Sequence, residues 1–103
     1  MTFQNVSIVD YRSSIAADAQ LVDVREQAEV AAGTLPQSVN IPVGELPARV
    51  GELDPARPVV LFCRSGGRSA NAAEYLVDAG FGDVTNLTGG MLAWEDAGHD
   101  AGH

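Results

Sequence analysis

The sequence is poor in the residue types from which disulfides and metal sites are built. Its 103 residues include one cysteine, two histidines and no lysine, so all six cationic side chains are arginines. One cysteine cannot form an internal disulfide. Both histidines, His99 and His103, lie at the end of the chain, without the spacing of a metal-ligand cluster. We therefore expect neither a metal nor a cofactor.

Long hydrophobic runs are also missing. The longest apolar stretches, such as Pro58–Cys63, are far shorter than the roughly 20 residues that a membrane-spanning helix requires. The first residues, Met1–Asn5, lack the charged-then-apolar pattern of a signal peptide. We expect one compact domain over residues 1–103, located in the cytoplasm and without a membrane partner.

Positive charge is scarce, since the formal net charge is −8. Such a surface repels nucleic acid and anionic membranes, so neither is an expected partner. Two of the six arginines, Arg64 and Arg68, nevertheless lie close together in the sequence. They predict a local positive patch on an otherwise acidic molecule.

Short apolar runs alternate with stretches of helical spacing along the chain. The runs, rich in β-branched residues, predict strands at Val6–Val9, Leu21–Val24, Val39–Ile41, Val59–Cys63 and Val84–Leu87. The intervening stretches predict helices at Tyr11–Ala19, Glu26–Ala32, Glu45–Leu53, Arg68–Ala79 and Met91–Ala97. This alternation predicts an α/β fold, in which helices cover both faces of a five-stranded parallel sheet.

Ligands of open α/β sheets bind beyond the carboxyl ends of the strands, which directs attention to the segment from Cys63 to Ser69. Gly66 and Gly67 give the backbone the freedom to curl its amides into an anion-binding nest. A helix beginning near Arg68 adds the positive end of its dipole. These features favour a Cys63 thiolate without a histidine base.

A free cysteine at the end of a strand is often only part of the core. Glycine pairs and surface arginines are each weak signals when taken alone. The combination of one cysteine, two glycines and two arginines between a strand and a helix is uncommon. It favours a reactive thiolate at Cys63.

The sequence resembles the rhodanese family over nearly its whole length. The most specific match is the loop Cys63-Arg64-Ser65-Gly66-Gly67-Arg68-Ser69. Three further segments match in the family's order, namely Leu21–Glu26 with its Asp-Val-Arg element, Val39–Pro42, and Leu87–Met91 with Trp94. The family's frequent Gly-His-Ile-Pro-Gly-Ala is replaced here by Gly33-Thr34-Leu35-Pro36-Gln37-Ser38, which leaves the donor preference open.

The resemblance implies a rhodanese-like α/β domain with sulfurtransferase activity. Cys63 would accept sulfur from thiosulfate or another small anionic donor and release it to a thiophilic acceptor or an acceptor protein. The resemblance assigns substrate binding to Arg64, Ser65, Gly66, Gly67, Arg68 and Ser69. It assigns a supporting role for the loop to Asp23 and Arg25.

Two other functions are compatible with the same loop. A phosphatase or arsenate reductase also surrounds an oxyanion with a thiolate and an arginine. Such phosphatases place five residues between the two, however, whereas four separate Cys63 from Arg68. A non-catalytic or sulfur-carrying rhodanese-like module that acts with a partner protein is the second alternative. Degenerate modules of this kind typically lack the cysteine.

Overall fold

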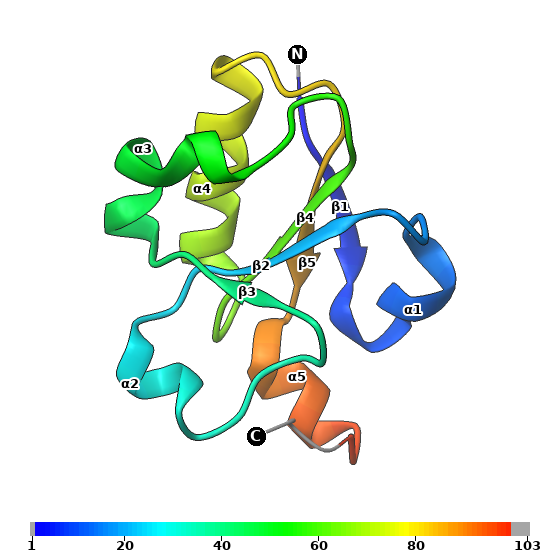
Figure 1. The fold of residues 1–103 in the computed structure, drawn as a ribbon. Coiled ribbons are helices and arrows are strands. Elements are labelled where there is room, and N and C mark those ends of the chain that lie inside the picture. The colour runs from blue at the N-terminus through cyan, green and yellow to red at the C-terminus, as the bar shows by residue number, and fades with distance from the viewer. Residues whose placement is uncertain (1, 100–103) are drawn as a thin grey trace.

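A computed structural model describes residues 2–99, in which strands and helices alternate along the chain (Figure 1). The strands are β1 (Gln4–Ser7), β2 (Gln20–Asp23), β3 (Val39–Asn40), β4 (Val59–Phe62) and β5 (Val84–Thr88). The helices are α1 (Tyr11–Ser14), α2 (Gln27–Val30), α3 (Leu46–Arg49), α4 (Gly67–Asp78) and α5 (Gly90–Asp96).

The five strands form one sheet in the order β1-β5-β4-β2-β3, and every neighbouring pair is parallel. This confirms the predicted fold class. Strand β4 lies at the centre, where all four of its residues are buried. The register pairs Phe62 with Asp23 and Leu61 with Asn86. The carboxyl ends of β2, β4 and β5 therefore lie side by side, and the residues that end or follow these strands are close together in space.

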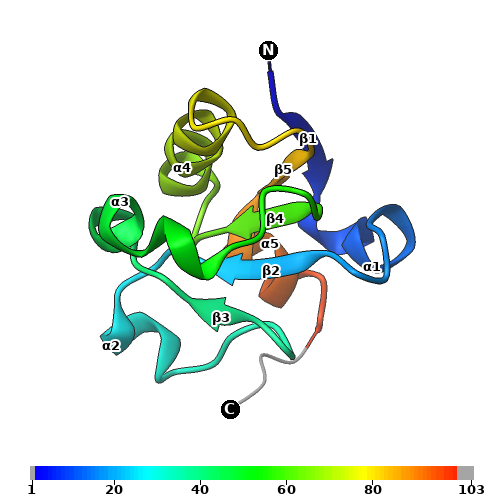
Figure 2. The same cartoon turned by 45° about the horizontal axis from the view of Figure 1, so that its top comes forward.

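Helices cover both faces of the sheet, and each face has its own core (Figure 2). On one face, α3 and α4 pack on the sheet through residues such as Leu46 and Leu76. On the other face, α1 and α5 pack through Tyr11, Met91 and Trp94. The chain thus buries both sides of β4, as its continuous apolar sequence predicts.

The first strand begins and ends two residues earlier than the sequence predicts. Strand β1 covers Gln4–Ser7, and the chain then enters a 3-10 turn at Ile8–Asp10. This strand lies at the edge and pairs only with β5, so its exposed residues Gln4 and Asn5 need no apolar side chains. An apolar run is therefore a poor guide to an edge strand.

Three predicted helices are shorter in the structure, and the helix expected at Glu26–Ala32 is limited to α2 at Gln27–Val30. Helix α1 ends at Ser14 because Ile15 is extended, with φ −112° and ψ 155°. The predicted helix Glu45–Leu53 is divided into α3 and flanking 3-10 turns at Val43–Glu45 and Val50–Glu52. Pro47 in the first turn of α3 has no amide hydrogen to donate, and Gly51 weakens its continuation. Within residues 2–99, no helix is long and apolar enough to cross a membrane.

Candidate active site

The predicted loop runs from the end of β4 to the first turn of α4. Cys63 directly follows Phe62, the last residue of the strand, and Gly67 begins the helix. Between them, Gly66 has φ 107°, a left-handed conformation that L side chains rarely adopt. This reversal turns the chain back over the sulfur, so that the loop closes around Cys63.

The sulfur of Cys63 is buried, with the residue 1% exposed, and it accepts hydrogen bonds from the loop. The amide of Gly66 donates to Sγ at 3.0 Å, and the hydroxyl of Ser69 lies 3.4 Å from it. Burial raises the pKa of the Cys63 thiol, but hydrogen bonds from Ser69 and from the amides of Gly66 and Ser65 outweigh that effect. The pKa therefore lies below the usual thiol value, as expected for an activated thiolate.

Strand β5 holds Ser69 in place through Asn86, a buried side chain on the neighbouring strand. The single proton of the Ser69 hydroxyl can be donated either to Oδ1 of Asn86, at 2.5 Å, or to Sγ, at 3.4 Å, and the hydroxyl oxygen also lies 3.2 Å from the carbonyl oxygen of Gly66. Asn86 in turn donates through Nδ2 to Oδ1 of Asn5 on β1, at 3.1 Å. The position of the Ser69 hydroxyl beside the sulfur thus depends on two other strands.

Helix α5 supports the same loop from its other side. The amides of Met91 and Leu92 donate to the carbonyl oxygens of Cys63 and Arg64, at 2.9 and 3.0 Å. Gly90, with φ 58°, allows this approach. A Cβ atom at Gly90 would lie 2.5 Å from the carbonyl oxygen of Cys63 and closer still to that of Arg64. Any side chain at position 90 would therefore push α5 away from the loop.

The two arginines of the loop have different surroundings. Arg64 is exposed, and among residues 2–99 its side chain has no hydrogen bond or ion pair. Arg68 instead forms a bidentate ion pair with Glu29 of α2, in which Nη1 and Nη2 lie 2.6 and 2.9 Å from the two carboxylate oxygens. Both arginines belong to the loop, and the side chain of Arg68 already has a partner in Glu29.

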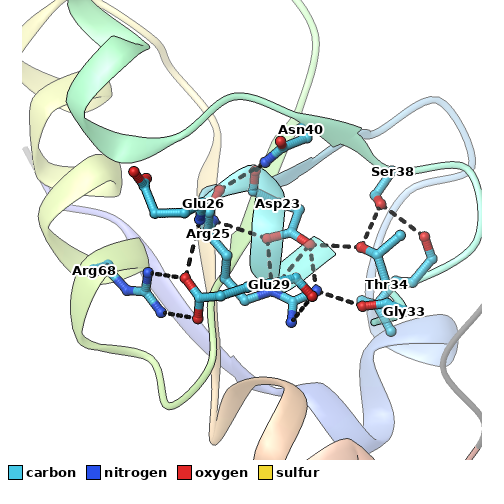
Figure 3. A network of polar contacts seen from close by, with 10 residues as sticks. Asp23, Arg25, Glu26, Glu29, Gly33, Thr34, Ser38, Asn40 and Arg68 are labelled. Atoms are coloured by element: carbon cyan, nitrogen blue, oxygen red, sulfur yellow. Dashed lines mark hydrogen bonds and ion pairs between the residues drawn. The ribbon is translucent and has the colours of Figure 1, made fainter. Parts of the chain in front are cut away.

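A buried ion pair lies beside the loop, between the ends of β2 and β3 (Figure 3). Asp23 accepts hydrogen bonds from Nε and Nη2 of Arg25, and from the hydroxyl of Thr34 at 2.7 Å. Arg25 also donates to the carbonyl oxygen of Gly33 at 2.7 Å. The side chain of Asn40 donates to the carbonyl oxygens of Asp23 and Arg25. This network fixes the segment that carries α2 and Glu29.

The rhodanese-like domain model matches residues 5–97 of the sequence. The chain belongs to the rhodanese-like domain family. A protein from Allochromatium vinosum named sulfurtransferase is 46% identical over 77 residues, which cover 75% of this chain and 72% of the relative. The thiosulfate sulfurtransferase GlpE of Shewanella oneidensis is 38% identical over 82 residues, covering 80% and 81% of the two chains.

A solved rhodanese-related protein from Thermoplasma volcanium superposes with a TM-score of 0.84 at 30% sequence identity. The match covers 95% of this chain and 96% of that one. Together with the named relatives, this likeness supports sulfur transfer as the activity at the level of the rhodanese family. Within residues 2–99, no group of three histidine, cysteine or acidic side chains is arranged to hold a metal ion.

Sequence reasoning assigned no role at this rhodanese loop to Glu29, Asn86 or Gly90, although Gly90 lies within the matched segment Leu87–Met91. The segment Glu26–Glu29 carries a detectable signal, because its two glutamates form the capping box that begins α2. That pattern predicts a helix start and gives no indication of Arg68, which lies 39 residues away. Asn86 and Gly90 carry no local signal for their contacts with the loop.

Removing the hydroxyl of Ser69 tests its effect on the thiol. In Ser69→Ala, burial still raises the pKa of Cys63 while one hydrogen-bond donor is lost, so the pKa should rise. Alkylation by iodoacetamide at pH 7 should slow by about tenfold, and its midpoint should move to higher pH. The remote Ser13→Ala, on α1, should react as the wild type does. An unchanged midpoint in Ser69→Ala would show that Ser69 does not stabilise the thiolate.

Proposed function

We propose that this chain transfers a sulfane sulfur from thiosulfate or a similar small anion to a thiophilic acceptor, through a persulfide on Cys63. Cys63 is the nucleophile in this proposal. The donor is bound by the amides of Ser65, Gly66, Gly67 and Ser69 together with the side chains of Arg64 and Arg68. The acceptor is a small thiophile such as cyanide, or the thiol of an acceptor protein.

The observation that carries the proposal is the position of Sγ within the loop. A buried sulfur that accepts hydrogen bonds from the Gly66 amide and the Ser69 hydroxyl is stabilised as a thiolate. The same donors are suited to stabilise the charge of a terminal persulfide sulfur. Cys63 is only 1% exposed, so a bulky group has little room to approach Sγ. This burial favours reaction with a single terminal atom, such as the sulfane sulfur of a donor.

The reaction consists of two displacements on sulfur. In the first, the Cys63 thiolate attacks the outer sulfur of thiosulfate, an S–S bond to Sγ forms, and sulfite leaves with the electron pair of the broken S–S bond. In the second, the acceptor attacks the outer sulfur of the persulfide. Cyanide becomes thiocyanate, and the Cys63 thiolate is restored. Neither step requires an external oxidant or reductant.

Two features of the loop disfavour phosphatase activity. Four residues separate Cys63 from Arg68, one fewer than in cysteine-dependent phosphatases. Both terminal nitrogens of Arg68 are bound to Glu29, so the guanidinium acts on a bound anion through its charge and is not free to clamp a phosphoryl group with two hydrogen bonds. A sulfur-carrier role with a partner protein uses the same Cys63 persulfide and differs only in the acceptor.

Steady-state kinetics with thiosulfate and cyanide test the two-step reaction. Because the sulfur rests on Cys63 between two half-reactions at one site, double-reciprocal plots at several cyanide concentrations should be parallel. This ping-pong pattern requires that sulfite leaves before cyanide reacts. Lines that intersect would mean that donor and acceptor bind together, and would contradict a covalent intermediate.

A further inference from the structure

The ion pair between Arg68 and Glu29 joins the first turn of α4 to α2 beside the loop. Figure 3 shows the guanidinium facing the carboxylate with both terminal nitrogens. Glu29 is also held from its own helix, because the amide of Glu26 donates to its Oε1 at 3.1 Å. The two side chains are 36% and 30% exposed, so the pair is open to solvent but fixed in geometry.

Negative charge dominates the immediate surroundings of Arg68. The hydrogen bond from Arg68 lowers the pKa of Glu29 to about 2, so this carboxylate stays ionised at neutral pH. Glu29, the Cys63 sulfur and Glu26 all raise the pKa of Arg68, with Glu29 contributing most. One guanidinium therefore faces two carboxylates and a thiolate. Among the two loop arginines, only Arg64 is free of an ion pair within residues 2–99.

A cavity of about 250 Å³ lies beside the loop, between α2 and α5. Its wall includes Arg64 from the loop, Glu29 from α2, and Met91, Leu92 and Glu95 from α5. Leu92 is 41% exposed, and the side chain of Glu95 forms no ion pair within the described part of the chain. The cavity thus offers Arg64, which is unpaired within residues 2–99, Arg25 in its ion pair with Asp23, two carboxylates and an apolar surface.

We propose that Glu29 is a positioning and specificity residue, which holds Arg68, offsets its charge and shifts the donor preference toward organic sulfane donors with a single negative charge. The inference rests on the proposed sulfur transfer. A carboxylate at the loop repels a doubly charged donor about twice as strongly as a singly charged one. The apolar wall formed by Met91 and Leu92 favours an organic substituent over the third, charged oxygen of thiosulfate.

Thiosulfate and methanethiosulfonate form a matched pair of donors for this test. Each presents a terminal sulfane sulfur on an oxidised sulfur, but thiosulfate carries two charges and methanethiosulfonate carries one. Cys63 attacks the terminal sulfur in both cases, and either sulfite or methanesulfinate leaves with the electron pair. The quantity to measure is the ratio of kcat/KM for methanethiosulfonate to kcat/KM for thiosulfate, with cyanide as acceptor at low ionic strength.

In Glu29→Gln, the amide oxygen can still accept a hydrogen bond from Arg68, but the negative charge is gone. The donor ratio should fall by about threefold to tenfold relative to the wild type, mainly because KM for thiosulfate decreases. Glu95→Gln, which removes a charge from the same cavity without breaking a hydrogen bond within residues 2–99, should change the ratio in the same direction by less. This second variant tests the effect of cavity charge without altering the Arg68 ion pair, and an unchanged ratio in it would contradict that effect.

Glu52→Gln is the control for overall charge. Glu52 also accepts two hydrogen bonds from one arginine, Arg49, but this pair belongs to the α3 segment, outside the loop and its cavity. The control should leave the donor ratio unchanged. Equal losses with both donors in Glu29→Gln, or an unchanged ratio in a folded variant, would overturn the specificity role. Wild-type protein that takes sulfur from neither donor would instead overturn the proposed function.

Discussion

Cys63→Ser is expected to abolish sulfur loading and to lower thiocyanate formation by about a thousandfold or more. The serine hydroxyl is nearly un-ionised at neutral pH and cannot form a persulfide. Its size is close to that of the thiol, and the Gly66 amide that donates to Sγ at 3.0 Å can donate to the new oxygen. The free energy of unfolding should therefore change by only about 1 kcal/mol.

Intact mass after incubation with thiosulfate measures the loading, and thermal unfolding measures the fold. Cys63→Ala is a useful companion, because it removes the nucleophile without adding a buried hydroxyl. Both variants should remain folded and unloaded. A folded Cys63→Ser protein that still makes thiocyanate at the wild-type rate would exclude Cys63 as the nucleophile.

Inserting one glycine between Gly66 and Gly67 is expected to lower kcat/KM with thiosulfate by at least about tenfold. The insertion gives Cys63 and Arg68 the five-residue spacing of phosphatases. It also moves Ser69 and Arg68 relative to their partners Asn86 and Glu29, because those partners lie on separate elements. Donors that stabilise charge must lie about 3 Å from it, so a wider loop loses much of its effect.

A glycine inserted after Gly82 controls for the added chain length. Gly82 lies in the exposed connection between α4 and β5, and a Cβ atom there would meet nothing within 4 Å. This variant should keep its thiosulfate activity. If the loop insertion also kept full activity in a folded protein, loop size would not select the substrate, and the main argument against a phosphatase would be lost.

The sequence predicts the centre of this fold better than its edges. The buried runs at β2, β4 and β5 and the amphipathic stretches at α4 and α5 are found close to where they are expected. Most of their buried side chains are apolar, because both faces of the sheet are covered. Strand β1 at the edge has no such requirement and is displaced. The α3 segment is interrupted by local effects of proline and glycine that periodicity alone does not reveal.

In the candidate site, too, the residues that are contiguous in the sequence could be predicted, whereas those brought together only by the fold could not. The loop from Cys63 to Ser69 is contiguous, so its strand end, glycines and helix start can all be found in the sequence. The residues that constrain it are separated from it along the chain: Glu29 on α2, Asn86 on β5 and Gly90 on α5. Only the strand order and register bring them together, and no local pattern contains that information.

The intact mass of the wild-type protein is the most direct test of the central claim, that Cys63 carries the transferred sulfur. After incubation with thiosulfate and removal of excess donor, the mass should increase by one sulfur atom. Peptide analysis should locate that atom on Cys63, and cyanide should remove it with release of one thiocyanate. A mass that stays unchanged after thiosulfate, or an added sulfur that cyanide cannot remove, would contradict the persulfide mechanism.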